Sequence, residues 1–307
     1  MSKYAFFHGE IVPIEDAKIS IRTHTFNYGT GCFGGIRAYW NPDQEQLYVF
    51  RIDDHYKRFL DSCKMLLIDL PYGVADLKQI TLDLLRREGF REDTYCRPLG
   101  YKSDEVIGVR LHNLKGDFAL FMEPFGRYLK SEEGCKAMVS SWRRIDDNAI
   151  PARGKIVGAY VNSAFAKTEA VLNGFDEAIV LDQDGHVSEG SAMNLFIVRD
   201  GVLITPPVTD NVLEGITRRT VMTLASEALG LSCQERSIDR TELYLCDEAF
   251  FCGTGVQMAA ISSVDQRPVG TGEMGPIVQK LRQLYFDVVR GKHEDYREQW
   301  CTPVYER

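Results

Sequence analysis

This 307-residue sequence lacks several features that mark particular classes of protein. No apolar stretch approaches the roughly 18 residues of a membrane-spanning helix, and the first residues lack the apolar core of a secretory signal. None of the eight cysteines forms a CxxC pair or a Cys/His cluster with zinc spacing. Positive charge is also scarce, with 36 Lys+Arg against 44 Asp+Glu and a net charge of −8. These absences argue against a membrane protein, a metal centre and a nucleic-acid-binding surface.

The remaining composition is typical of a globular enzyme. The chain is 44% hydrophobic and 26% charged, as in ordinary folded domains, and unpaired cysteines are usual in a reducing compartment. We therefore expect a cytoplasmic protein. Its length predicts two domains or one large domain.

Apolar periodicity predicts alternating strands and helices. Strands are expected at 4–12 (with a turn at 8–10), 36–40, 46–51, 94–99, 117–122, 177–182, 194–199 and 202–205, and helices at 53–67, 74–88, 163–172, 216–229 and 276–289. Asp184-Gly185 and Asp200-Gly201 predict hairpin turns. This pattern favours α/β or α+β domains with much antiparallel sheet. The apolar pattern lapses at 123–133, which predicts a linker between a domain at 1–122 and a domain at 134–307.

The first motif is glycine-rich. Residues 29–34 formally match GxGxxG, which in a dinucleotide-binding fold follows a strand and opens a helix. The residues after it are β-branched and aromatic and stop at Pro42, so a helix is not expected there. We interpret the motif as a tight loop near a ligand that presents Phe33.

Four further motifs are weak when taken singly. Gly215-Ile216-Thr217 opens a helix, where free N–H groups suit an anion, and the strand-ending Gly253-Thr254-Gly255 turn offers similar donors. Lys155 lies among small and apolar residues, which favour a neutral, nucleophilic amine. Glu189 is flanked by small residues. The alternatives are an ordinary helix start, an ordinary turn and two surface charges.

Taken together, these motifs resemble one family. The order and spacing of Lys155, Tyr160, Glu189 with Asn194, residues 215–217 and residues 253–254 are similar to those of class IV (fold-type IV) pyridoxal-phosphate-dependent aminotransferases, above all the branched-chain amino acid group. Residues 28–37, 55–62 and 95–99 extend the resemblance, and SEGSAMNLF and DGVLITPP are its most specific stretches. It implies a smaller N-terminal α/β domain and a larger C-terminal domain with a pseudo-barrel sheet.

The resemblance also implies a cofactor site for pyridoxal 5′-phosphate (PLP). Lys155 would hold the cofactor as a Schiff base and shuttle a proton, Glu189 would pair with the pyridine nitrogen, and Tyr160 would bond the 3′ oxygen. The phosphate would be held by Arg58, Ile216, Thr217 and Thr254, and the expected cofactor-binding set is completed by Asn194, Gly215 and Gly253. No metal is expected.

The implied reaction converts L-Leu, L-Ile and L-Val with 2-oxoglutarate to branched-chain 2-oxo acids and L-glutamate. The expected substrate-binding residues are Tyr28, Phe33, Arg37, Tyr95, Arg97, Val109, Phe125, Tyr128, Thr254 and Gly255. Some of them would come from the partner subunit of a homodimer or higher homo-oligomer.

Two positions depart from the family pattern. Gly34 stands where many branched-chain members have an acidic residue, and Phe125 stands where a tryptophan is common, so both changes could enlarge the pocket. Three alternatives therefore stay open: a transaminase for D-amino acids or (R)-amines, a lyase similar to aminodeoxychorismate lyase, and a binding protein with a decayed site. The last is disfavoured because the lysine, glutamate, tyrosine, arginine and threonine positions are all filled by competent residues.

Overall fold

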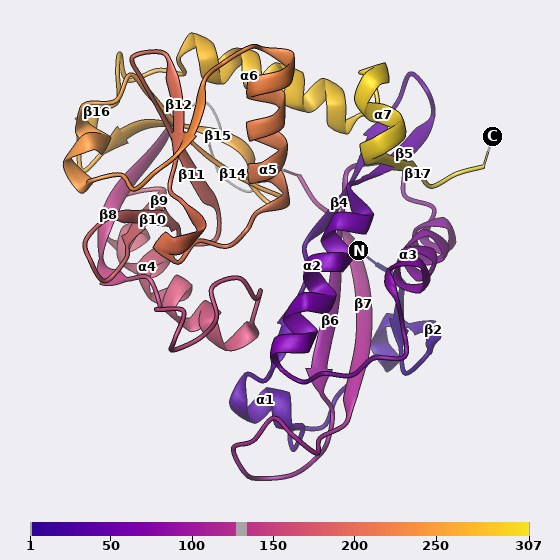
Figure 1. Ribbon diagram of the computed structural model, residues 1–307. Coiled ribbons are helices and arrows are strands. Elements are labelled where there is room, and N and C mark those ends of the chain that lie inside the picture. Colours follow the sequence, from indigo (N-terminus) through magenta and orange to yellow (C-terminus); the bar gives the residue numbers. More distant parts are fainter. Residues whose placement is uncertain (1, 127–133, 307) are drawn as a thin grey trace. The chain divides into compact units, whose positions relative to one another are not determined.

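The computed structural model describes residues 2–126 and 134–306, which fall into two compact units (Figure 1). Unit 1 comprises residues 1–126, 154–158 and 287–307, and unit 2 comprises residues 127–153 and 159–286. The C-terminal residues therefore belong with the N-terminal ones. Since 127–133 lies outside the described residues, the predicted linker at 123–133 stays a proposal.

Unit 1 is built on an antiparallel sheet. Its described strands have the order β17-β5-β4-β6-β7-β1-β2, with β3 paired to β6. The strands are β1 (Tyr4–Phe7), β2 (Glu10–Pro13), β3 (Gly31–Phe33), β4 (Ile36–Asn41), β5 (Gln46–Phe50), β6 (Thr94–Lys102), β7 (Gly116–Pro124) and β17 (Cys301–Pro303). The helices are α1 (His24–Tyr28), α2 (Ile52–Met65), α3 (Val74–Glu88) and α7 (Glu294–Trp300), with the 3-10 turn η1 (Ile14–Asp16).

Aromatic packing joins α2 to this sheet. The Phe59 ring of α2 lies 5.8 Å from that of Phe118 on β7 and 6.1 Å from that of Tyr56, and all three side chains are buried. Buried and half-buried side chains alternate along the first part of β6, as expected for a strand with one face on a core. The sheet and α2 thus pack together and support the site residues of unit 1.

Unit 2 contains a mixed sheet. Its order is β10-β9-β8-β15-β14-β11-β12-β13, with β16 paired to β15. The strands are β8 (Cys135–Arg143), β9 (Glu177–Leu181), β10 (Val187–Gly190), β11 (Asn194–Arg199), β12 (Val202–Thr205), β13 (Cys233–Glu235), β14 (Glu248–Gly253), β15 (Gln257–Val264) and β16 (Arg267–Pro268). The helical segments are η2 (Val157–Ala159), which begins in unit 1, α4 (Tyr160–Leu172), η3 (Val208–Asp210), α5 (Ile216–Thr223), the π-helical η4 (Leu224–Ala228), η5 (Arg240–Tyr244) and α6 (Pro276–Val289), which ends in unit 1.

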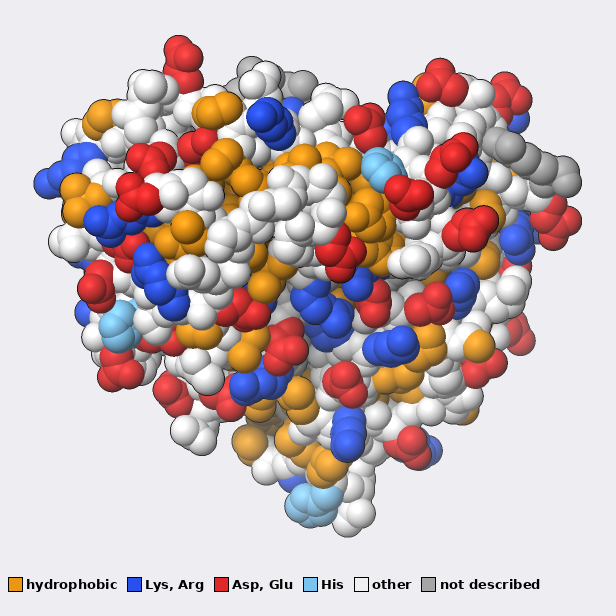
Figure 2. Space-filling view, turned by 45° about the horizontal axis from the view of Figure 1, so that its top comes forward, with side chains coloured by type: hydrophobic (Ala, Val, Ile, Leu, Met, Phe, Trp, Pro, Cys, Tyr) orange, Lys and Arg blue, Asp and Glu red, His pale blue; other side chains and the backbone are white. Residues whose placement is uncertain are grey.

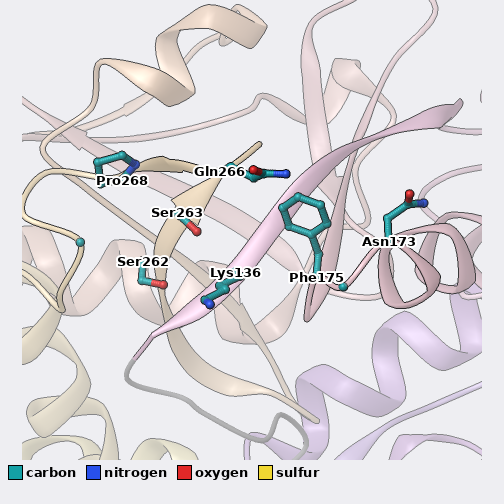
Figure 3. A pocket seen from close by; sticks show the side chains of 9 residues that line it. Lys136, Asn173, Phe175, Ser262, Ser263, Gln266 and Pro268 are labelled. Carbon is teal, nitrogen blue, oxygen red and sulfur yellow. The ribbon is translucent and has the colours of Figure 1, made fainter.

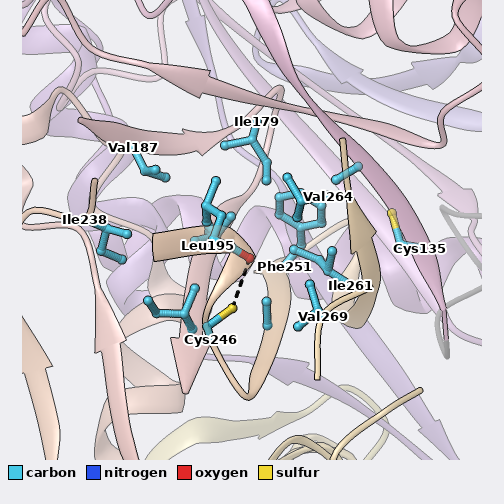
Figure 4. Close-up of a cluster of buried hydrophobic side chains, with 14 of the residues drawn as sticks. Cys135, Ile179, Val187, Leu195, Ile238, Cys246, Phe251, Ile261, Val264 and Val269 are labelled. Carbon is cyan, nitrogen blue, oxygen red and sulfur yellow. Dashed lines mark hydrogen bonds between the residues drawn. The ribbon is translucent and has the colours of Figure 1, made fainter. Parts of the chain in front are cut away.

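The sheet of unit 2 curls around an apolar core. Strand β10 stands at one end of the strand order, yet the Gly190 N–H donates to the Met193 carbonyl at 2.7 Å, so β10 turns directly into β11. The core includes Leu195 and Phe251 from neighbouring strands, and the Cys246 thiol donates to the Leu243 carbonyl at 3.4 Å (Figure 4). This curled sheet confirms the predicted mixed α/β class.

Most predicted elements are present. The helix at 74–88 has the expected bounds and ends at Gly89, whose φ of +70° is left-handed. The expected helix at 216–229 is divided instead, because α5 passes at Leu224 into the π-helical η4. Among the elements that were not predicted are the five-residue α1, the long strands β8 and β15, the short strands β3, β13, β16 and β17, and the helix α7.

Candidate active site

The backbone of Lys155 is held by two elements of unit 1. Its N–H donates to the Ser62 hydroxyl on α2 at 3.1 Å, and its carbonyl accepts the Phe33 N–H at 3.0 Å. The Ser62 hydroxyl in turn donates to the carbonyl of Arg58, one helical turn earlier, at 2.9 Å. The structure thus links Lys155 and Arg58 within one unit. Sequence analysis missed Ser62, because a buried serine in a helix carries no pattern of its own.

Two cations lie near the ring of Phe33. The Lys155 Nζ is 5.0 Å and the Arg97 guanidinium carbon 4.5 Å from the ring centroid. Arg97 also donates to the Tyr95 hydroxyl at 3.1 Å, and the Tyr95 ring lies 5.2 Å from that of Phe125. Among the described residues, the buried Nε of Arg97 has no hydrogen-bond partner. An unsatisfied donor in a buried position is costly, so this atom suits an anionic ligand.

Arg37 has a different environment. Its side chain is buried, and Nη2 donates to the carbonyls of Phe125 and Gly126 at 2.6 and 2.9 Å. Its contacts therefore hold the end of the segment that precedes 127–133. Tyr128, the remaining predicted residue of this segment, lies outside the described residues.

Gly34 and Gly35 are small because their neighbours need the space. A Cβ at Gly34 would lie 2.5 Å from Cγ of Pro98, and one at Gly35 would lie 2.3 Å from the Tyr95 hydroxyl. Pro98 therefore fills the space into which a side chain at position 34 would project. This packing argues against the expectation that Gly34 enlarges a pocket.

Tyr28 and Val109 lie in a second part of unit 1. The Tyr28 hydroxyl accepts the Gly108 N–H at 3.1 Å, and His24 Nε2 lies 2.9 Å from the Gly108 carbonyl. These bonds tie α1 to the segment that carries Val109, whose side chain is 86% exposed. Within this unit Val109 covers no core.

Glu189 is the centre of a polar network in unit 2. The side chain is almost completely buried. Oε2 accepts hydrogen bonds from Asn194 Nδ2 at 2.9 Å and from the Leu213 N–H at 3.1 Å. Oε1 lies 3.0 Å from Nη2 of Arg144. Buried charges need such partners, and the network shows that Glu189 is not a solvated surface charge.

Arg144 was missed by sequence analysis. The signal that points to it is the Arg143-Arg144 pair at the end of a strand-like segment, which reads equally well as two surface charges. The Leu213 N–H has no sequence signal, because every residue except proline offers a backbone N–H.

The start of α5 lies beside this network. Asn194 Nδ2 also donates to the Leu213 carbonyl at 2.9 Å, and a Cβ at Gly215 would lie only 2.0 Å from Asn194 Oδ1. Gly215 is the N-cap of α5, and Ile216 and Thr217 form its buried first turn. The N–H groups of a first turn have no intrahelical acceptor, so this end of α5 suits a phosphate.

The remaining predicted residues of unit 2 lie at element ends. Gly253 is the last residue of β14, and Thr254 and Gly255 follow it in a half-buried turn. Tyr160 is the first residue of α4 and is half-buried. The structure thus brings Glu189, Asn194 and Gly215 together in unit 2, and Phe33, Arg97 and Lys155 together in unit 1.

The cysteines near these residues are poor nucleophiles. Burial raises the pKa of the Cys96 and Cys252 thiols far above the ordinary value. All eight cysteines are free thiols, and seven of them are buried. Since the thiolate is the reactive form, Cys96 and Cys252 are poor candidates for a nucleophile.

A hollow of about 550 Å³ lies elsewhere in unit 2. Lys136, Phe175, Ser262 and Gln266 are among its lining residues (Figure 3). Its lining contains none of the predicted site residues.

Three general findings concern other functions. The described residues contain no cluster of three or more His, Cys, Asp or Glu side chains suited to a metal ion. Within the same residues, no helix has the length and apolar character needed to cross a membrane. Acidic and basic side chains are interspersed over the face shown in Figure 2, unlike the basic face of a nucleic-acid-binding protein.

Comparison with known proteins identifies the family. The family model of amino-transferase class IV matches residues 31–264. This range includes Lys155, Glu189 and the glycine motifs at 215–217 and 253–255. The chain belongs to the class IV aminotransferases.

Three proteins to which the chain is similar are all named as branched-chain aminotransferases. The probable branched-chain-amino-acid aminotransferase of Aquifex aeolicus is 48% identical over 99% of this chain and 97% of its own length. The crystal structure of the branched-chain aminotransferase from Thermoproteus uzoniensis with norvaline is 44% identical, with a TM-score of 0.95 over 99% of this chain and 100% of that one. The T.th. branched-chain amino acid aminotransferase, complexed with N-(5′-phosphopyridoxyl)-L-glutamate, is 38% identical, with a TM-score of 0.93 over 99% of each chain.

Proposed function

We propose that the protein is a PLP-dependent branched-chain amino acid aminotransferase that transfers the amino group of L-Leu, L-Ile or L-Val to 2-oxoglutarate. The observation that carries the proposal is the Glu189 network, because a buried carboxylate held by Asn194, the Leu213 N–H and Arg144 suits the protonated ring nitrogen of this cofactor. The full-length similarity to enzymes of that name supports the same conclusion.

The described residues fit the cofactor. Lys155 offers an amine, Glu189 an acceptor, and the first turn of α5 at Ile216 and Thr217 a phosphate site. Arg58, Tyr160 and Thr254 would complete the set. When bound, the cofactor acts as an electron sink for the bond broken at the substrate Cα.

The protein itself would supply a base and orientation. The amine of Lys155 would take up the proton released at the substrate Cα. Its backbone is fixed by Ser62 and Phe33, so the amine moves only by side-chain rotation. The ring of Phe33, whose centroid lies 5.0 Å from the amine, presents an apolar surface beside it.

The neighbouring aromatic side chains fit both kinds of substrate. Phe33, Tyr95 and Phe125 form an apolar wall that suits leucine, isoleucine or valine. Arg97 lies on this wall with an unpartnered Nε, which suits the second carboxylate of glutamate or 2-oxoglutarate. The T.th. enzyme was solved with a glutamate derivative and the Thermoproteus enzyme with an apolar amino acid, which supports this dual use.

Arg97→Gln tests this assignment. Because a hydrogen bond to a charged group contributes about 1.5–3 kcal/mol, the KM for 2-oxoglutarate should rise about 10- to 100-fold, while the half-reaction with L-leucine changes little. Steady-state kinetics with 2-oxoglutarate and with L-leucine measure the two effects. Tyr95→Phe, which removes one hydroxyl on Arg97, should have a smaller effect in the same direction. An equal loss for both substrates would contradict the assigned role.

We also propose a homodimer that acts in the cytoplasm. Apolar side chains on the α1 region and the 104–109 segment are exposed together, with Ile21 at 79%, Ile107 at 94% and Val109 at 86%. Hydrogen bonds of His24 and Tyr28 to Gly108 join the two segments. Exposed apolar surface of this kind marks an interaction site, and a second copy is the partner that would bring Val109 to a substrate.

A further inference from the structure

The two oxygens of Glu189 have different partners. Oε2 accepts the N–H groups of Asn194 and Leu213 and is fully engaged. Oε1 faces the guanidinium of Arg144 at 3.0 Å. Both charged side chains are withdrawn from water, with exposed fractions of 5% for Glu189 and 10% for Arg144. The pair is therefore a buried ion pair in unit 2, not a surface contact.

Arg144 is itself fixed in place. Its backbone N–H donates to the Leu181 carbonyl at 2.7 Å, and its carbonyl accepts from Gln183 Nε2 at 3.0 Å. Its Nε donates to the Asn211 carbonyl at 3.1 Å. A guanidinium held at its backbone and at Nε presents Nη2 in one direction. That direction is the Glu189 carboxylate.

The positive charge of Arg144 favours the ionised form of the Glu189 carboxyl group. A buried carboxylate without a cation either takes up a proton or turns towards another donor. With a guanidinium at hydrogen-bond distance, the ionised form is favoured and the carboxylate plane is fixed. Asn194 and the Leu213 N–H fix the same plane from the other oxygen.

We propose that Arg144 is a positioning residue that keeps Glu189 ionised and oriented, so that the proton shared with the cofactor stays on the ring nitrogen. This inference rests on the proposed function. Arg144 does not touch the substrate in this account and acts only through Glu189. The neighbouring Arg143 offers a contrast, because its side chain is exposed and its Nη1 donates to the Asp182 carbonyl at 3.1 Å.

The test compares Arg144→Gln with the matched control Arg143→Gln. Each apoprotein is loaded with PLP labelled with ¹⁵N in the ring, and the ¹⁵N chemical shift reports whether the ring nitrogen carries a proton. In Arg144→Gln the shift should move towards that of the unprotonated ring, and PLP should bind the apoprotein about 10-fold more weakly. Arg143→Gln should match the wild type in both measurements. Arg144→Lys should restore part of the wild-type shift.

Other outcomes have definite meanings. A wild-type ¹⁵N shift in a folded, PLP-loaded Arg144→Gln protein would overturn the inference. If that variant does not fold, Arg144→Lys and a cycle with Glu189→Gln decide instead. In a protein that already carries Glu189→Gln, Arg144→Lys should cause no further change in the ¹⁵N shift. If Arg144→Lys changes the shift as much there as in the wild type, Arg144 does not act through Glu189. If the wild type binds no PLP at all, the proposed function itself fails.

Discussion

Gly215 shows how closely single residues are fitted in this site. Its absent side chain leaves room for the Asn194 amide, which bonds both Glu189 and the Leu213 carbonyl. The sequence pointed to Gly215 as the start of a helix and, through the family resemblance, as one of the expected cofactor-binding residues. Its contact with Asn194 needs the curled sheet to bring β11 beside α5, and this is visible only in three dimensions.

Gly215→Ala should therefore destabilise unit 2. The new Cβ would lie 2.0 Å from Asn194 Oδ1, so the amide must move and its bond to Glu189 is lost. We expect the free energy of unfolding to fall by about 1–3 kcal/mol, measured by denaturant titration, with weaker binding of PLP. Gly134→Ala is the control, because its Cβ would make only ordinary contacts at 3.5 Å and beyond. Equal stability of the two variants would show that Asn194 is not held as described.

Among the helices and strands, apolar periodicity predicted those whose bounds depend mainly on local sequence. Helix α3 has an apolar face and a glycine just after its last turn, and its predicted bounds were confirmed. The helix predicted at 216–229 is present as a helical segment over 216–228, but at Leu224 it passes from α5 into the π-helical η4, a change of hydrogen-bond pattern that the apolar pattern did not reveal. Strand β8 was missed because Lys136, Ser140 and Ser141 interrupt its apolar pattern.

The end of α3 gives a prediction about backbone conformation alone. Gly89 adopts a φ of +70°, and a Cβ there would meet no atom within 4 Å. Gly89→Ala should lower the free energy of unfolding by about 1 kcal/mol, through the left-handed conformation only. Gly89→Asn should lose less, because asparagine tolerates this conformation. Thermal unfolding should show the wild type as the most stable, Gly89→Asn as the next and Gly89→Ala as the least stable. A Gly89→Ala protein at least as stable as the wild type would contradict this explanation.

For the whole molecule, the family resemblance predicted more of the fold and function than composition and periodicity did. The family, the mixed α/β fold and the PLP cofactor followed from the order of Lys155, Glu189 and the two glycine turns, and the comparisons agree. The roles of individual residues stay proposals. Arg144 and Ser62 were not predictable, because their importance depends on which distant residues they contact.

The proposed dimer surface can be tested directly. Ile107→Glu places a charge on a side chain that is 94% exposed within unit 1. We expect it to shift the protein from dimer to monomer at micromolar concentration, because a buried unpaired charge is costly at an interface. Sedimentation velocity measures the change. Leu172→Glu, at an 81% exposed position on α4, is the control and should leave the dimer intact, whereas dissociation by the control alone would place the interface elsewhere.

Lys155 and bound PLP carry the proposed transamination of branched-chain L-amino acids. The most direct measurement is the absorption spectrum of the purified, PLP-loaded protein during single half-reactions. L-leucine should convert the PLP spectrum to that of the pyridoxamine form, 2-oxoglutarate should restore it, and Lys155→Ala should show neither change. A D-alanine reaction much faster than that of L-leucine, or product release with no pyridoxamine form, would contradict the account.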